Sequence, residues 1–170
     1  MKRASWLLVL AAALGSLQCG YHLSGSGRSL PAGAATIAIP DFKNETSRPQ
    51  TEQFVTFAVR EEFVRRTRLR LAESPRNADL FLEGAITSFT TSPLSYSASG
   101  QANLYEVRLT LDIRLVDMKS GDLVYQGNGL SFQETYETEN ADFFSQETDS
   151  LGKIAAKFAS SIVTSILENF

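Results

Sequence analysis

The chain has 170 residues, of which 43% are hydrophobic and 21% are charged, and its formal net charge is −3. This length fits one domain of ordinary size, the composition excludes a disordered or collagen-like chain, and the acidic balance argues against a general nucleic-acid binder. The only cysteine is Cys19, which excludes an intramolecular disulfide and a multi-cysteine metal site.

The N-terminus has the pattern of a targeting segment. Lys2 and Arg3 are followed by the apolar run 6–14, which is typical of a secretory signal. The run is shorter than the roughly 20 apolar residues of a transmembrane helix, and no later stretch reaches that length. We therefore expect residues 1–18 to be removed on export, which takes away two of the 16 basic residues and none of the 19 acidic ones.

Cys19 follows the apolar run closely, and its position resembles that of the acylated cysteine of bacterial lipoproteins. Ser16 and Gln18 stand where the usual pattern has an aliphatic and a small residue, so the leucines beside them would have to serve in a relaxed register. More than one acyl chain is needed for stable anchoring, which this modification supplies. The alternative is ordinary cleavage near residues 11–13, which leaves a free thiol. Gly20 indicates the outer membrane, because inner-membrane retention usually has Asp there.

The first half of the exported chain predicts a tether followed by five short segments. Residues 19–35 are expected to form a lipidated tether, since 24–35 are rich in Gly, Ser and Ala. In the helix, Val55, Val59 and Phe63 repeat at four-residue spacing, which gives one apolar face. The predicted elements are a strand at 36–40, a loop at 41–49, a helix at about 51–66, a brief strand at 69–71 and a turn at 74–77.

The second half predicts three strands and a long helix. Apolar and polar residues alternate strictly over 105–115, so one face of that strand is buried and the other is not. The predicted elements are a strand at 79–91 with Gly84 as a bulge, a polar loop at 92–100, a hairpin of 105–115 with 123–134 that has a bulge or bend at 127–129, and a helix from about 141 to 168.

This element order predicts a single α+β domain over residues 36–170. Two helices pack on one face of a mixed, mainly antiparallel sheet, and the other face is polar. Such a free face either meets solvent or is offered to a partner.

Little in the sequence favours catalysis. The single histidine, His22, lies in the tether, where a catalytic base would lack a rigid pocket and an orienting partner. The acidic stretch 134–149 lacks the spacing of an EF-hand, and no glycine-rich phosphate loop follows a strand. We therefore predict that the protein is not an enzyme and holds no metal and no cofactor.

Three cations are candidate contacts to the anionic groups of a glycolipid. Arg108 and Arg114 project from the polar face of the clearest strand, and Lys119 lies in the turn after it. Arginine forks match phosphate groups in a bidentate geometry. The simpler interpretation is ordinary cross-strand charge pairing, with Glu106 and Asp112 adjacent on the same face.

A second basic group, Arg60, Arg65, Arg66 and Arg68, falls at the end of the predicted first helix. Cations there suit the helix dipole and are ordinarily solvated. The functional interpretation is contact with lipid phosphates.

Several ordered segments together resemble the LptE family of lipopolysaccharide-assembly lipoproteins, over almost the whole chain. The segments are 19–23, 30–31, 36–40, 41–46, 61–70, 78–79, 82–86, 116–117 and 161–168. The resemblance implies two helices on a sheet and a periplasm-facing protein anchored in the outer membrane. It also implies a partner, the β-barrel translocon LptD, whose lumen the lipoprotein plugs while assisting barrel assembly and lipopolysaccharide insertion. Only Cys19 is carried over from the family, as the acylation site.

Two other functions stay open at this point. A free-standing lipoprotein that binds a hydrophobic or cell-wall ligand would be a stable monomer away from any barrel. An envelope hydrolase is the third hypothesis, which the poverty in histidine and the lack of a catalytic motif argue against.

Overall fold

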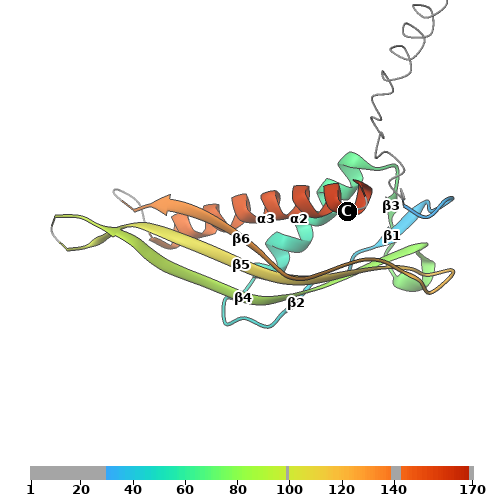
Figure 1. Cartoon of the computed structure of the whole chain (residues 1–170), viewed down its shortest axis with the longest axis horizontal. Helices are drawn as coiled ribbons and strands as arrows, with labels where there is room; N and C mark the ends of the chain where they lie inside the picture. The colour runs from blue at the N-terminus through green and yellow to red at the C-terminus, as the bar shows by residue number, and fades with distance from the viewer. Residues whose placement is uncertain (1–29, 99, 139–142, 169–170) are drawn as a thin grey trace, which may run out of the picture.

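A computed structural model describes residues 30–98, 100–138 and 143–168 (Figure 1). The predicted signal segment and most of the predicted tether lie outside these residues. The elements in chain order are β1 (Thr36–Ala38), β2 (Lys43–Asn44), α2 (Thr51–Arg66), β3 (Arg70–Leu71), a 3-10 turn (Pro75–Asn77), β4 (Leu80–Tyr96), β5 (Ala102–Asp117), β6 (Leu123–Glu137) and α3 (Phe143–Glu168).

The sheet is mixed and open, with the order β3-β1-β4-β5-β6, and β2 pairs with β4 beside that path. Strands β1 and β3, β1 and β4, and β2 and β4 are parallel, whereas the long strands β4, β5 and β6 are antiparallel. Both helices cover the same face of the sheet, as Figure 1 shows. The predicted fold class, α+β with two helices on one face of a mainly antiparallel sheet, is therefore confirmed.

The core lies between the helices and this face, where the sequence pattern places it. The apolar positions of β5 are all buried: Val107, Leu109, Leu111, Ile113 and Leu115. Helix α2 spans the predicted residues, and its three four-spaced side chains, Val55, Val59 and Phe63, are fully buried. Helix α3 adds a stripe of eight buried residues: Leu151, Ile154, Ala155, Phe158, Ala159, Ile162, Val163 and Ile166.

The predicted polar loop at 92–100 is wrong over its first half, because β4 continues to Tyr96. Ser92 pairs with Glu106 and Pro93 with Tyr105, so the pairing of β4 with β5 continues beyond the part of the sheet that the helices cover. Neither face of this part of β4 is buried, so the core leaves no apolar period there to reveal the strand. The predicted loop at 41–49 is likewise interrupted by β2, whose Lys43 is in register with Ala85.

Two predicted distortions of the sheet involve glycines. The bulge predicted at Gly84 is wrong, since Gly84 pairs in regular register with Ile113 and the shift falls between Ile86 and Ser88. The bend predicted at 127–129 is confirmed by a register shift between β5 and β6 and by the positive φ of Gly129, 61°. Position 84 needs a glycine for another reason, which is that a Cβ there would lie 2.5 Å from the Phe42 ring.

Replacing Gly84 with alanine is expected to lower the free energy of unfolding by about 1–3 kcal/mol, as an overpacked core does. The Phe42 ring is only 3% exposed and cannot move into solvent without losing its own burial. Urea denaturation measures the loss. The matched control is Gly152→Ala, because no atom lies within 4 Å of a Cβ at this α3 position. The control should stabilise the protein by up to about 1 kcal/mol, and equal effects at the two glycines would contradict the Phe42 contact.

Candidate functional site

The free face of β4, β5 and β6 is polar over the middle of the sheet. On β5 the exposed or half-buried positions Arg108, Thr110 and Arg114 alternate with core residues. On β6, Gln133 pairs with Arg108 and Ser131 with Thr110 on the same face. No helix of the described residues covers this face (Figure 1). It is a broad hydrogen-bonding surface and not a cleft.

The predicted contact Arg108 already has an anionic partner. Its guanidinium Nη2 lies 2.6 Å from Oε1 of Glu106, two residues earlier on the same strand. Arg108 is therefore charge-paired, as the simpler interpretation expects, but the pair lies within one strand and not across two strands. Arg108 still has donors left for a second anion, because a guanidinium carries five N–H groups.

Arg114 lies at the rim of a shallow hollow of about 340 Å³ on the free face. Its nearest carboxylate is Glu83 on β4, at 3.5 Å, whereas Asp112 instead accepts a hydrogen bond of 2.6 Å from the backbone N–H of Gly129. Lys43 of β2 lines the same hollow and forms an ion pair of 2.7 Å with Glu45, which raises the Lys43 pKa. Sequence reasoning missed Lys43, since its proximity to Arg114 depends on the parallel pairing of β2 with β4.

Lys119 forms an ion pair that connects the turn between β5 and β6 to Asp79, the residue directly before β4. Its Nζ lies 2.7 Å from Oδ1 of Asp79. The other carboxylate oxygen of Asp79 accepts hydrogen bonds from the backbone N–H groups of Ala35 and Thr36, at 2.8 and 3.0 Å, and from the Thr36 hydroxyl at 2.9 Å. Lys119 and these donors hold the pKa of Asp79 well below its usual range, and Asp79 in turn raises the pKa of Lys119. Lys119 therefore has a structural role, because its ion pair with Asp79 joins the β5–β6 turn to the starts of β1 and β4.

Replacing Asp79 with asparagine is expected to lower the melting temperature at neutral pH. It should also make the melting temperature fall less as the pH is lowered into the acid range. A carboxylate with a lowered folded-state pKa stabilises the fold above its unfolded pKa of about 4, and this contribution is lost as the pH falls below that value. Thermal melts between neutral pH and pH of about 2.5 measure the difference. Asp149→Asn, an exposed change on α3, is the control. If the melting temperature of the Asp79 variant fell with pH as steeply as that of the unsubstituted protein, the contacts of Asp79 would not contribute to stability.

The three predicted cations do not form one site. Arg108 and Arg114 share a face but stand six positions apart on one strand, which is about 20 Å. Lys119 lies beyond the end of that strand, in the turn. A ligand that touches all three would have to extend along β5.

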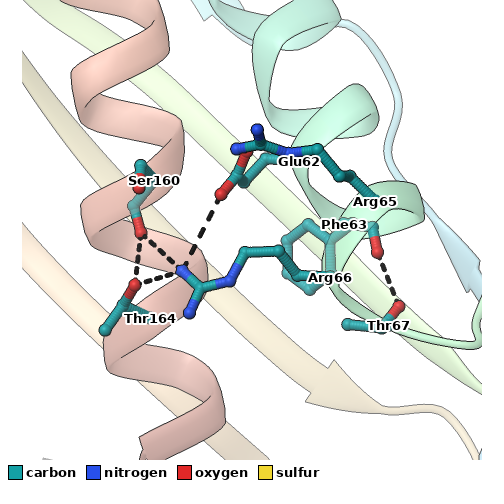
Figure 2. Close-up of polar contacts among 7 residues, drawn as sticks. All are labelled: Glu62, Phe63, Arg65, Arg66, Thr67, Ser160 and Thr164. Atoms are coloured by element: carbon teal, nitrogen blue, oxygen red, sulfur yellow. Dashed lines mark hydrogen bonds and ion pairs between the residues drawn. The ribbon is translucent and has the colours of Figure 1, made fainter.

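A polar cluster joins the two helices and uses two of the arginines from the predicted basic group (Figure 2). Glu62, only 6% exposed, accepts a hydrogen bond from Arg65 and lies 3.7 Å from Nη1 of Arg66. Arg66 also donates to the Thr164 hydroxyl and to the backbone oxygen of Ser160 on α3. Arg66 therefore bridges the helices, which its place at the end of α2 did not reveal.

The acidic stretch 134–149 is divided between separate partners. Glu147 is buried and lies 2.9 Å from Nη2 of Arg48, and it accepts a hydrogen bond of 2.8 Å from the Thr91 hydroxyl. Glu134 pairs with Lys157 instead. Burial, followed by the nearby charge of Glu147, raises the pKa of Tyr136 to about 12. This phenol therefore stays protonated across the physiological range.

Cys19 and His22 lie outside the described residues. Across 30–98, 100–138 and 143–168, no group of three His, Cys, Asp or Glu side chains is arranged to hold a metal ion. Neither helix in this part of the chain combines the length and the apolar character that crossing a membrane requires.

The fold and the described side chains define a small α+β protein whose polar groups spread over a free sheet face. The chain belongs to the LptE family, because the family model, described as lipopolysaccharide assembly, matches residues 34–166. No curated protein matches the sequence.

Solved structures share the fold at low sequence identity. A candidate lipoprotein from Caulobacter crescentus CB15 is 20% identical with a TM-score of 0.55, and the match covers 75% of this chain and 88% of that one. A hypothetical protein from Chlamydia trachomatis is 11% identical with a TM-score of 0.53, covering 78% and 95%. The PelC dodecamer of Paraburkholderia phytofirmans is 16% identical with a TM-score of 0.51, covering 82% and 93%. These likenesses concern the fold alone.

Proposed function

We propose that this LptE-family protein is an outer-membrane lipoprotein, anchored through acyl groups on Cys19 and facing the periplasm. The signal pattern before Cys19 and Gly20 after it support this placement. The sheet of the described domain begins at Thr36 and Leu30 already packs against the core, so the residues between Cys19 and Leu30 serve as the tether.

The protein is further proposed to plug the lumen of an LptD-type β-barrel and to assist lipopolysaccharide insertion, without catalysis. The free sheet face carries this proposal, because hydroxyl, amide and charged side chains along β5 and β6 suit the polar interior of such a barrel. Binding a barrel wall needs a broad hydrogen-bonding surface and no pocket. The free face has this form.

Affinity purification of the tagged full-length protein from outer membranes tests both parts. We expect a stoichiometric β-barrel to co-elute, and mass spectrometry to find Cys19 acylated. The Cys19→Ser variant should leave the membrane fraction unless the barrel retains it. A monomer without any barrel would overturn the plug role and favour the free-standing lipoprotein.

Direct contact with lipopolysaccharide is proposed for Arg108 and Arg114, with Lys43 beside Arg114. Replacing Arg108 and Arg114 with glutamine should weaken lipopolysaccharide binding by about tenfold or more, since a hydrogen bond to a charged group contributes about 1.5–3 kcal/mol. The control is Lys153→Gln, an exposed cation on α3. Lys119→Gln is expected to act through stability, because Lys119 is bound to Asp79. Equal weakening by the Lys153 control would show that only total charge matters.

A further inference from the structure

Three exposed hydrophobic side chains surround one hollow beside α2. Phe57 is 61% exposed, Val64 51% and Leu71 44%, and all three line a shallow hollow of about 580 Å³. Ala156 and Ala159 of α3 form its far side. Single exposed apolar residues are ordinary, whereas several around one hollow make it a candidate contact surface.

The hollow lies at the end of the molecule where the tether joins the domain. Leu71 belongs to β3, which pairs with β1, the first strand after the tether, with Ile37 opposite Leu71. Leu30, the first described residue, packs against the core. In Figure 1, β1, β3 and the last turn of α2 lie at one end, and the turn between β4 and β5 lies at the opposite end.

The length of the tether limits how far this end can stand from a bilayer. Eleven peptide steps separate Cys19 from Leu30, and even a fully extended chain spans at most about 40 Å over that length. If Cys19 carries the anchor, as the proposed function states, the end with the hollow is therefore held near the inner leaflet. The turn between β4 and β5 is then the part farthest from the anchor.

The charge around the hollow is complementary to anionic headgroups. Residues 60–70 contain five arginines and two glutamates, in a chain of net charge −3. Arg60 and Arg65 line the hollow itself, as do Glu61 and Glu62, and both arginines pair with carboxylates. The excess positive charge therefore lies beside the hollow. Arg68 and Arg70 are exposed, and no carboxylate of the described residues forms an ion pair with either. A basic residue near an anionic membrane surface contributes about 1 kcal/mol.

We propose that the α2 hollow is a membrane-contact surface that rests on the anionic phospholipids of the inner leaflet. Phe57, Val64 and Leu71 enter the headgroup region, and the arginines of 60–70 meet lipid phosphates around them. The contact fixes the orientation of the domain on its anchor, and the β4–β5 turn is the part of the domain farthest from the contact. This inference rests on the proposed anchor and adds the face by which the protein lies on the bilayer.

Site-specific fluorescence on the acylated full protein tests the surface. Acylation consumes the only natural thiol, so Val64→Cys supplies a single position for an environment-sensitive dye. Leu94→Cys is the matched control, because both natural side chains are 51% exposed and Leu94 lies on the distal part of β4. Each protein is reconstituted into vesicles of phosphatidylethanolamine and phosphatidylglycerol that carry a doxyl-labelled quencher.

We expect the dye at position 64 to be blue-shifted and quenched several-fold more than the dye at position 94. The difference should shrink in vesicles of phosphatidylcholine alone. Equal, weak quenching at both positions in protein that floats with the vesicles would overturn the surface while leaving the anchor intact. A blue shift at 64 without quenching, growing with protein density, would overturn it in favour of a second copy of this chain. Dye labelling of the unsubstituted protein would instead report a free Cys19 and contradict the anchor.

Discussion

Replacing Phe158 with alanine is expected to lower the free energy of unfolding by about 3–5 kcal/mol, a large part of the 5–15 kcal/mol that a domain typically has. Phe158 is fully buried at the middle of α3, and its ring meets that of Phe132 on β6 edge-on, with centroids 5.3 Å apart. The cavity would open between the helix layer and the sheet, where the backbone on both sides is held by regular structure. Urea denaturation should show a lower midpoint with little change in slope.

Phe57→Ala is the matched control for this experiment, since the same side chain is removed from a position that is 61% exposed. In buffer without lipid, the control should change the free energy of unfolding by no more than about 0.5 kcal/mol. Similar losses at the two positions would mean that α3 does not pack on β6 as the structure shows. The comparison also separates the fold from the proposed membrane contact, because Phe57 belongs only to the latter.

Much of the fold could be predicted where burial leaves a period in the sequence. Helix α2 and strand β5 each have one face in the core, so apolar residues recur at four-residue and two-residue spacing. The end of β4 had no such signal. Its residues from Ser92 to Tyr96 pair with β5 in a part of the strand that has no buried face, so hydrogen bonds hold the strand there without a core to impose a pattern.

The candidate site was less predictable, because its geometry depends on partners distant in the sequence. That Arg108 and Arg114 lie on the polar face followed from strand alternation. That Lys119 binds Asp79 and that Lys43 reaches the hollow beside Arg114 followed only from strand order, which the sequence could not supply. The acidic stretch 134–149 appeared as one charged edge, yet one of its members is the buried partner of an arginine on a distant loop.

That arginine, Arg48, leads to the second large expected effect. Arg48→Ala should lower the free energy of unfolding by about 3 kcal/mol or more, because removing one member of a buried ion pair leaves the other charge without compensation. The Glu147 side chain is only 8% exposed, and in the variant the Thr91 hydroxyl is the one donor that the described residues would still offer it. Arg48 is itself 26% exposed, so the effect should fall at the low end of the range for buried pairs.

Glu147→Gln in the same chain tests the cause, since it removes the uncompensated charge and keeps an oxygen for Thr91. The double variant should therefore be more stable than Arg48→Ala alone, and urea denaturation of the four proteins measures the coupling. Lys43→Ala is the control, because Lys43 and its partner Glu45 are 74% and 41% exposed and a surface pair of this kind contributes at most about 1 kcal/mol. If the double variant were no more stable than the single one, the loss would come from the arginine stem packed in the loop before α2, and the buried charge would not be its cause.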